Sequence, residues 1–337
     1  MLKHRRTAMA LALFTCANAV LLLAGFLAPY SPAQQYRDFA YVPPSRVHFV
    51  DANGTVHLRP FVYGLAAVDD DGFSYREDRN LIYPVHFFVH KGDGIHAFAV
   101  AEPGNIFLFG TDAFGRDIFS RVLYGGRISI GAALIATVIS LLVGTLLGAI
   151  AGHFGGFVDS AVMRGAELAL ALPWIYLLLA LRAALPLHLG PSQTLLLVWV
   201  VIGVMGWPRP ARLIRGVVLS GRERPFVMAA RGFGASEWYV LRRHVLPQAL
   251  GILITQAVIL VPQFITAEAT LSFLGLGMNE PVPSWGNMLS AFQHIQVMTS
   301  YWWIAAPAVV LVLVSASYFT LADVLDFTRI DSGNSYA

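Results

Sequence analysis

The stretch that decides the fold is ISIGAALIATVISLLVGTLLGAIA, residues 128–151, which runs for 24 residues without a charged side chain. A bilayer core about 30 Å thick needs about 20 apolar residues when the chain crosses it as a helix. Lipid offers the backbone no hydrogen-bond partners, so a crossing segment must satisfy its own N–H and C=O groups. This stretch therefore predicts a transmembrane helix.

Composition extends the prediction to the whole chain. Hydrophobic residues make up 56% and charged residues 13% of it, whereas a soluble domain carries about 25% charged residues. Further apolar runs of spanning length lie at residues 7–28, 168–187, 195–218, 249–267 and 302–322. We therefore expect an all-α polytopic membrane protein with six transmembrane helices.

The first apolar run could also belong to a cleaved signal peptide. Basic residues precede it at positions 3, 5 and 6, as they would in a signal peptide. However, a signal peptide has an apolar region of about 7 to 15 residues that ends at a small-residue site. This run has 22 residues and leads into Pro29 and Tyr30. We expect residues 1–28 to be a cytoplasmic N-terminus and a retained first helix.

Residues 29–127 have a different, polar character with strand signals. Apolar residues alternate around Asn53-Gly54, a strong hairpin signal. Residues 83–90 and 95–100 flank a second glycine-rich turn. The pattern predicts a small β-rich extracytoplasmic insert between the first and second helices. The alternating residues of the first pair are Val47, Phe49, Val56 and Leu58.

Histidines in the insert raise the question of a metal site. His86 and His90 share one face of an expected strand. Nothing in the sequence fixes a third ligand or its geometry. We therefore expect scattered surface histidines and no metal.

The basic residues fix the expected orientation. Between Arg209 and Arg243 there are eight Arg and two Glu. Short loops this rich in positive charge remain cytoplasmic. Six helices with an inner N-terminus place this loop on the inner side, between the fourth and fifth helices. Both termini, including the tail at residues 327–337, are then expected in the cytoplasm.

We name residues 219–247 the coupling loop and expect a helix, a turn and a second helix there. The small Ala229 and Ala230 allow another surface to approach closely. Gly234 can adopt the positive φ that ends a helix, and Ser236 can cap the next one. Pro247 is then expected in the first turn of the fifth helix. On spacing alone, an ordinary amphipathic connector remains an equal reading.

The coupling loop resembles the EAA loop of ABC importer permeases. That pattern is Glu-Ala-Ala, three residues, Gly, nine residues and Ile-x-Leu-Pro. Met228 stands where the family has Glu, and His244 stands where it has Ile. Pro225 is also unexpected in a docking helix. The residues implied to contact an ATPase are Phe226, Met228, Ala229, Ala230, Gly234, Leu246 and Pro247.

Three other motifs are similar to those of the dipeptide/oligopeptide/nickel importer group. They are GTDAFGRD at residues 110–117, GGFVD at 155–159, and LSFLGLG at 271–277 followed by PSWG at 283–286. The resemblance implies that residues 128–326 form a transmembrane domain with the type I ABC importer permease fold. No motif covers residues 29–102, and we assign that part of the insert no function.

The resemblance also implies partners and a mechanism. A homologous second permease would complete a heterodimer in a bacterial cytoplasmic membrane. Two cytoplasmic ATPases would bind Mg-ATP, and an extracytoplasmic solute-binding protein would deliver short peptides for import by alternating access. The alternative is that the same machinery imports another small solute, such as nickel or a nickel chelate. No nucleic-acid partner is expected, because the arginines lie beside membrane-spanning runs.

The sequence also argues against an enzyme and against a channel or secondary transporter. The chain contains no Gly-Lys pair, so it has no phosphate-binding G-x4-G-K-[ST] loop. We therefore expect no enzyme activity, no catalytic residue and no cofactor in this chain. An intramembrane enzyme would need paired catalytic groups within the apolar runs, and none is present there. A channel or secondary transporter would favour internal repeats or broken helices, which the sequence does not reveal.

Two features inside the expected helices carry predictions. Gly144, Gly148 and Gly152 recur every four residues, a spacing typical of close helix packing in lipid. Glu268, at the end of the fifth run, is an acid at membrane depth, where ionisable groups are costly and often functional. It is a candidate for the substrate pathway, or for an interfacial carboxylate paired with a neighbouring subunit.

Overall fold

The computed structural model describes residues 2–68, 74–91, 94–183, 191–278 and 280–334. The chain divides into two compact units, which we describe separately. The helical unit comprises Met1–Ala12, Ile130–Leu271 and Ser315–Ala337. The mixed unit comprises Leu13–Ser129 and Ser272–Val314.

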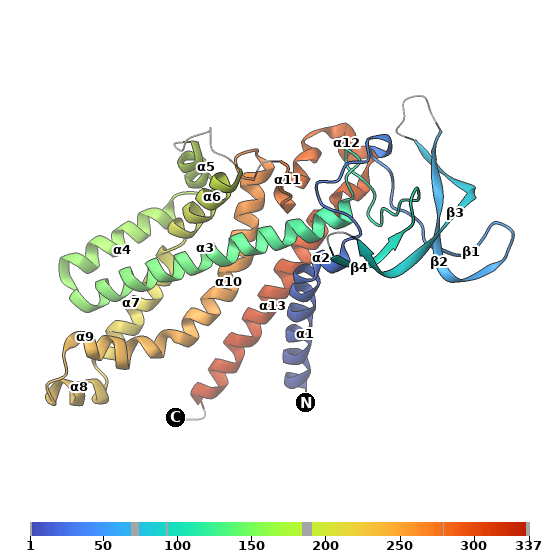
Figure 1. Ribbon diagram of the computed structural model, residues 1–337. Coiled ribbons are helices and arrows are strands. Elements are labelled where there is room, and N and C mark those ends of the chain that lie inside the picture. The colour runs from blue at the N-terminus through green and yellow to red at the C-terminus, as the bar shows by residue number, and fades with distance from the viewer. Residues whose placement is uncertain (1, 69–73, 92–93, 184–190, 279, 335–337) are drawn as a thin grey trace. The chain divides into compact units, whose positions relative to one another are not determined.

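Helices make up most of the described chain (Figure 1). The longest are α3, α10 and α13. A π-helical segment, Leu241–Val245, joins α9 to α10. The α-helices are α1 (Leu2–Leu22), α2 (Ala24–Leu27), α3 (Ile118–Phe154), α4 (Gly156–Ala171), α5 (Trp174–Ala183), α6 (Pro191–Met205), α7 (Pro208–Arg222), α8 (Pro225–Gly232), α9 (Glu237–Val240), α10 (Leu246–Phe273), α11 (Trp285–Leu289), α12 (Ile295–Ser300) and α13 (Ala306–Asn334).

Three helices in the described residues are long and apolar enough to cross a membrane: Ile118–Phe154, Glu237–Phe273 and Trp302–Leu325. A fourth crossing forms if Leu196–Met205 and Pro208–Arg222, bent by 43°, count as one span. A shorter apolar helix lies at Thr7–Leu22. The described chain thus gives three or four spans by length and composition, where the sequence led us to expect six.

Prolines explain where the expected spans break. Pro208 begins α7, because proline lacks an N–H and suits the first position of a helix. Pro173 forces Leu172 into an extended conformation with ψ 136°, which ends α4. The expected third span therefore becomes α4 and α5, and its last residues, 184–187, lie outside the described residues.

The boundary between the insert and the second span also differs from the prediction. Helix α3 begins at Ile118, ten residues before the expected start at 128. The additional turns carry polar and small residues, which an apolar-run criterion excludes. The segment between α2 and α3 therefore ends earlier than residue 127.

Helices α3 and α7 pack closely in the helical unit because one face of α3 is glycine-rich. A Cβ on Gly148 would lie 2.3 Å from the Ala211 carbonyl oxygen, so only glycine fits there. Gly144 and Gly152 have similarly close neighbours, Pro210 and Val218. The glycine spacing thus serves helix packing, as predicted.

An ion pair links α7 to α4 in the same unit. Arg215 Nη2 donates to Asp159 Oδ2 at 2.6 Å, and Arg215 Nε donates to Asp159 Oδ1. A guanidinium that makes two parallel bonds to a carboxylate fixes the geometry as well as the charge. This contact holds the first turn of α4 against the middle of α7.

The mixed unit contains a four-stranded antiparallel sheet in the order β1-β2-β3-β4. The strands are β1 (His48–Val50), β2 (Val56–Ala67), β3 (Tyr75–Lys91) and β4 (Gly94–Val100). Both predicted strand pairs form, with Val50 opposite Val56 and His90 opposite Ile95. The core beside the sheet consists of Tyr30, Val42, Val62, Val85, Ile106 and Phe107, all buried.

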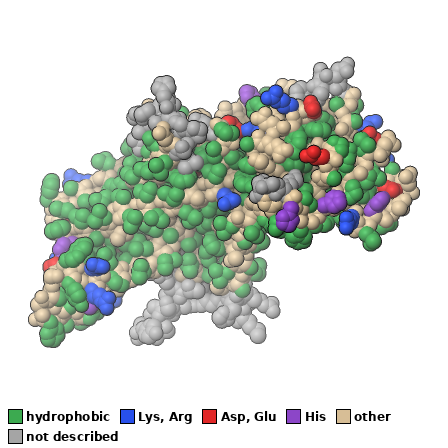
Figure 2. Space-filling model, in the orientation of Figure 1, with side chains coloured by type: hydrophobic (Ala, Val, Ile, Leu, Met, Phe, Trp, Pro, Cys, Tyr) green, Lys and Arg blue, Asp and Glu red, His purple; other side chains and the backbone are tan. Residues whose placement is uncertain are grey.

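The first hairpin turns at residues 51–55. Gly54 has φ +84°, and the Asp51 carboxylate accepts hydrogen bonds from the backbone N–H groups of Asn53 (2.8 Å) and Thr55 (2.9 Å). The alternating apolar residues that predicted this hairpin lie on its exposed face; Leu58, for example, is fully exposed. Figure 2 shows hydrophobic side chains covering the helices, while acidic, basic and histidine side chains gather over the sheet.

Candidate functional site

The coupling loop folds as two short helices with a sharp turn between them. Pro225 takes a first-turn position of α8, where its missing N–H costs nothing, which explains why proline is tolerated there. After α8, Gly234 has φ +85°, and the Ala235 N–H returns to the Ala230 carbonyl oxygen at 3.0 Å. The Ser236 hydroxyl caps α9 by accepting from the Tyr239 N–H at 3.3 Å. The predicted helix, turn and cap are all present.

Ion pairs hold this loop in shape. Arg231 binds Glu237 through two nitrogens, with Nε at 2.7 Å and Nη2 at 2.9 Å from the two carboxylate oxygens. Glu237 also lies 3.9 Å from His153 Nδ1 at the end of α3. Arg222 Nη1 donates to the carbonyl oxygens of Gly152 (3.1 Å) and His153 (3.0 Å). The loop is therefore attached to the last turn of α3.

One face of the coupling loop is part of a hydrophobic core. Val227 of α8, Val240 of α9 and Val245 of the π segment are buried together with Ile214 and Val218 of α7. Ala230, Ala235, Leu246 and Leu253 pack against this cluster. The loop is thus a folded part of the helical unit.

The other face is exposed and rich in large apolar side chains. Phe226 is 43% exposed, Met228 62% and Phe233 93%. Trp238 and Tyr239 of α9 are also exposed. Exposed apolar patches of this kind mark surfaces that contact protein partners or the membrane. Figure 1 shows α8 and α9 beyond the ends of α7 and α10.

The predicted coupling residues divide between these two faces. Phe226, Met228 and Ala229 are exposed on α8, and Gly234 is exposed at the turn. Ala230 and Leu246 pack against the hydrophobic core instead. Pro247 is exposed on the first turn of α10. Four of the seven residues are thus exposed on α8 or at the turn that follows it.

The position of Pro247 needs a refinement. It is the second residue of α10, but α9, the π segment and α10 run on as one helix, Glu237–Phe273. Pro247 therefore lies inside a long helix and does not start one. A proline in a helix interior removes one backbone hydrogen bond and clashes with the preceding turn. The wider π turn at Leu241–Val245, just upstream, accompanies this disruption.

Glu268 is fully buried within α10. It lies five residues before the end of that helix, at Phe273. A buried carboxylate at this depth is consistent with either reading given by the sequence.

A second constellation lies in the mixed unit, at the start of α3. Arg116 Nε donates to Asp112 Oδ2 at 2.7 Å. Its Nη1 and Nη2 donate to the two carboxylate oxygens of Glu280, at 2.5 and 3.1 Å. Arg121 Nη2 donates to Glu280 Oε1 at 2.9 Å. Two buried guanidiniums thus share one carboxylate that comes from the loop after α10.

The Asp117 side chain caps α3 beside this group. Its Oδ2 accepts from the Ser120 N–H at 2.8 Å and from the Ser120 hydroxyl at 2.6 Å. Asp117 is only 2% exposed. Burial raises the pKa of this carboxyl to about 7, because a charged carboxylate is costly away from water.

A cavity of about 360 Å³ opens next to the arginines. Its polar lining includes Asp112, Arg116, Arg121, Glu280, Asn287 and His294. Apolar side chains, among them Met288, Val297 and Ile304, form other parts of its wall. A cavity of this size with few polar groups is typical of a small-molecule site.

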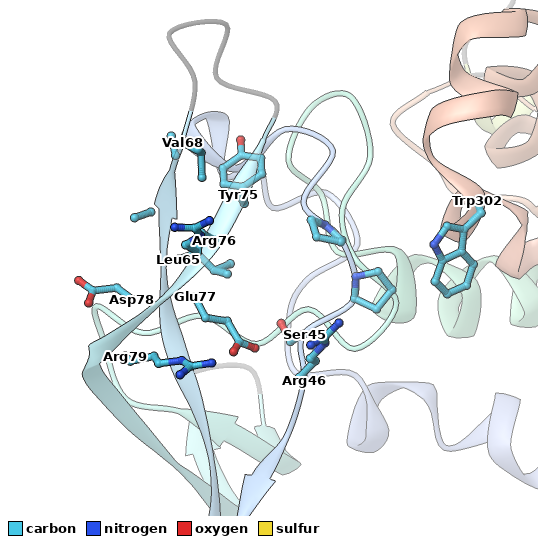
Figure 3. A pocket seen from close by; sticks show the side chains of 14 residues that line it. Ser45, Arg46, Leu65, Val68, Tyr75, Arg76, Glu77, Asp78, Arg79 and Trp302 are labelled. Carbon is cyan, nitrogen blue, oxygen red and sulfur yellow. The ribbon is translucent and has the colours of Figure 1, made fainter. Parts of the chain in front are cut away.

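A larger hollow of about 1220 Å³ lies between β2, β3 and the loop at residues 43–46 (Figure 3). Figure 3 shows Glu77 and Arg46 facing the middle of the hollow, with Trp302 on its far side. Arg76, Asp78 and Arg79 also line it. Side chains of both charges surround the hollow, so it favours neither cations nor anions.

The sequence did not reveal the group around Glu280. The motif at residues 110–117 contains Asp112 and Arg116, but their partner lies more than 160 residues away. One signal was available, because Glu280 is the sole acid between Glu268 and Asp323. Among the described residues, no three His, Cys, Asp or Glu side chains could together hold a metal ion.

Comparisons with known proteins identify relatives of the chain. Residues 144–330 match the family model "Binding-protein-dependent transport system inner membrane component". A putative peptide permease protein of Brucella suis is 38% identical over 253 residues, which are 75% of this chain and 80% of that protein. The probable D,D-dipeptide transport system permease protein DdpC of Escherichia coli is 37% identical over 72% of this chain and 80% of its own length.

A solved structure is also similar. The MetNI methionine ABC transporter, in an inward-facing conformation, matches with a TM-score of 0.41 and 18% sequence identity. The match covers 60% of this chain and 95% of that one.

Proposed function

Because the chain belongs to the family of binding-protein-dependent transport system inner membrane components, we propose that it is one of two membrane-spanning subunits of an ATP-driven ABC importer for short peptides. The relatives described above are named as peptide and dipeptide permeases. The single observation that carries the proposal for this chain is the exposed coupling surface, which consists of Phe226, Met228, Ala229, Phe233 and Trp238.

The coupling surface suits contact with an ATPase subunit. It lies on a loop that is anchored on its other face by a hydrophobic core. Exposed arginines flank it at positions 224, 242 and 243. In the proposed complex, two cytoplasmic ATPases bind Mg-ATP, and one of them binds this surface. We propose that a homologous permease and a solute-binding protein complete the assembly.

Because α9, the π segment and α10 form one continuous helix, movement of the coupling loop can pass to the membrane-spanning part of the chain. Glu237, at the start of the 37-residue helix, is paired with Arg231 of α8. Displacement of α8 by an ATPase therefore moves the cytoplasmic end of α10 directly. Because Arg222 attaches the same region to α3, we propose that α3, α7 and α10 move together as a rigid group.

The orientation of the chain is part of the proposal. The arginine excess of the coupling loop supports a cytoplasmic position for this loop, and with six crossings both termini would be cytoplasmic as well. The four-stranded sheet then lies on the extracytoplasmic side. Six membrane crossings would require α1 and the α4–α5 pair to cross as well. We propose Glu268 as a residue of the substrate pathway.

Reconstitution of the complex tests the proposal. The chain would be purified from membranes with its neighbouring-gene ATPases, second permease and solute-binding protein, and reconstituted into liposomes. We expect ATP-dependent uptake of a labelled dipeptide, together with peptide-stimulated ATP hydrolysis. Uptake by this chain alone without ATP would refute the importer proposal. Uptake of nickel or a nickel chelate, but of no peptide, would favour the alternative solute.

A further inference from the structure

The cavity at the start of α3 contains two arginines that are almost fully buried. Arg116 is 7% exposed and Arg121 is 1% exposed. A guanidinium has five N–H donors and no acceptor. Arg121 donates to Glu280 and to the Pro32 carbonyl oxygen (3.2 Å), and its buried Nε lies 3.8 Å from Asp112 Oδ2. The forked donors that face Glu280 are therefore the ones that a ligand could use.

Glu280 occupies this site as an internal ligand. Its two oxygens receive three hydrogen bonds from Arg116 and Arg121. Unlike the arginines, the Glu280 side chain is 46% exposed. Any carboxylate with the same access could accept the same forked hydrogen bonds. The half-exposed Glu280 side chain can move into water, whereas the buried arginines then need another carboxylate in its place.

Charge balance selects the ligand that could replace Glu280. Removing one partner from a buried ion pair leaves an uncompensated buried charge, which is strongly destabilising. The incoming group must therefore be an anion, and a carboxylate reproduces the forked hydrogen bonds that Glu280 makes. The displaced Glu280 carboxylate stays half-exposed at the rim of the cavity, where a cation on the ligand can pair with it. A zwitterion uses both groups at once.

The shape and lining of the cavity fit a small zwitterion. Its volume is about 360 Å³, within the range of roughly 300 to 1,000 Å³ typical of small-molecule sites. The apolar side chains of Met288, Val297 and Ile304 offer contacts for an aliphatic side chain. The His294 ring can form a hydrogen bond with an amide. Asn287 also lines the cavity, but its side chain already bonds the Ser284 N–H and the Val282 carbonyl oxygen.

We propose that this cavity binds a short free peptide, with its terminal carboxylate on Arg116 and Arg121 and its terminal ammonium on the displaced Glu280. The inference rests on the proposed function as a peptide importer and assigns this subunit a substrate-binding site of its own. Binding replaces Glu280 by the peptide carboxylate as the partner of both arginines and adds one pair between Glu280 and the ammonium, so every buried charge keeps a partner.

Binding to the full-length chain in lipid nanodiscs tests the proposal. Four probes would be titrated by isothermal calorimetry: alanyl-alanine, N-acetyl-alanyl-alanine, alanyl-alanine amide and acetate. We expect alanyl-alanine to bind about tenfold more tightly than its acetylated form, the ratio for one hydrogen-bonded charge pair. The amide should not bind. Equal affinity for the amide and the free peptide, or for acetate and the free peptide, would overturn the proposal.

The variant Glu280→Gln separates the two charge contacts. Without the competing carboxylate, N-acetyl-alanyl-alanine should bind about tenfold more tightly than to the unmodified chain. The preference for a free ammonium should disappear. Glu102→Gln, which changes an exposed acid of the same unit outside the cavity, should leave all affinities unchanged. If Glu280→Gln leaves them unchanged too, the inference is wrong.

Uptake by the complete transporter distinguishes the two proposals. Peptide uptake with no peptide binding to the nanodisc-embedded chain would refute the binding site and leave the proposed function intact. Failure of all peptide uptake would refute the proposed function. Should Glu280→Gln fail to fold, the four probes on the unmodified chain still decide the question.

Discussion

Arg222 caps the C-terminal end of α3 by donating a hydrogen bond from Nη1 to the Gly152 carbonyl oxygen at 3.1 Å. A second bond from the same nitrogen reaches the next carbonyl. The last carbonyls of a helix lack partners within the helix and carry partial negative charge, so a guanidinium there is doubly favourable. This contact attaches the coupling loop to a span that is distant in sequence.

Arg222→Ala should therefore destabilise the helical unit by about 1 to 2 kcal/mol, because charged hydrogen bonds are lost at a half-buried site. Thermal unfolding in detergent would measure the change. Arg224→Ala, which removes an exposed arginine two residues away, is the matched control and should have almost no effect. Equal melting temperatures for the two variants would contradict the capping role.

Gly234→Val tests the turn of the coupling loop. At φ +85° a β-branched residue is strained, with a cost of about 1 to 2 kcal/mol. We expect the variant to insert in the membrane but to lose peptide uptake, because α8 would no longer be held in position. Gly232→Val places the same side chain on α8 where a Cβ meets no neighbouring atom. That control should keep most of the uptake.

Ala229 and Ala230 are adjacent, but they lie on different faces of α8. Ala229 is exposed, whereas Ala230 packs against the hydrophobic core. Ala229→Glu should abolish ATPase binding and uptake with an unchanged melting temperature. Ala230→Glu should lower the melting temperature as well, since it brings a charge to the core. Co-purification of the ATPase and thermal unfolding would together separate the two effects; identical behaviour would argue against a dedicated outer surface.

The Asp159–Arg215 pair predicts a pH dependence of stability. The hydrogen bond from Arg215 lowers the pKa of Asp159 below its ordinary value. An acid whose pKa is lower in the folded state contributes stability above its unfolded pKa, about 3.9, and loses it as pH falls through the folded pKa. Asp159→Asn should therefore lower the melting temperature at pH 7, and the difference from the unmodified chain should shrink below about pH 4. A constant difference would refute the charged pair.

Asp117 predicts the opposite pH dependence of stability from that of Asp159. Its pKa is raised to about 7 by burial. An acid of this kind has its full stability below the unfolded pKa and loses stability as pH rises from about 4 through 7. Asp117→Asn should therefore flatten the stability profile between pH 5 and pH 8. Thermal unfolding across that range would measure it, and an unchanged slope would mean that Asp117 is ionised throughout.

Local patterns predicted much of the coupling loop. Gly234 and Ser236 have the backbone roles expected of a helix-ending glycine and a helix cap. Their effect depends on neighbouring residues alone, so a single sequence is sufficient. The glycine repeat at 144, 148 and 152 likewise predicted close helix packing.

Contacts between distant segments, and breaks within an apolar run, could not be predicted from local patterns. The contact between Arg116 and Glu280 joins segments 164 residues apart, and no local pattern encodes it. The apolar run at 168–187 concealed the break at Pro173, because a hydropathy criterion counts proline as one residue among many. Alternation around Asn53-Gly54 predicted the hairpin, but it did not indicate that Leu58 lies on the exposed face.

The π turn at Leu241–Val245 has a consequence for how α9 and α10 are phased. One extra residue in a helix rotates everything beyond it by about 100° relative to a regular α-helix. The outward direction of Trp238 is therefore offset from the angle that α10 alone would dictate. These five π-helical residues thus determine the rotation of Trp238 about the helix axis, and with it the direction from which a partner can contact this side chain.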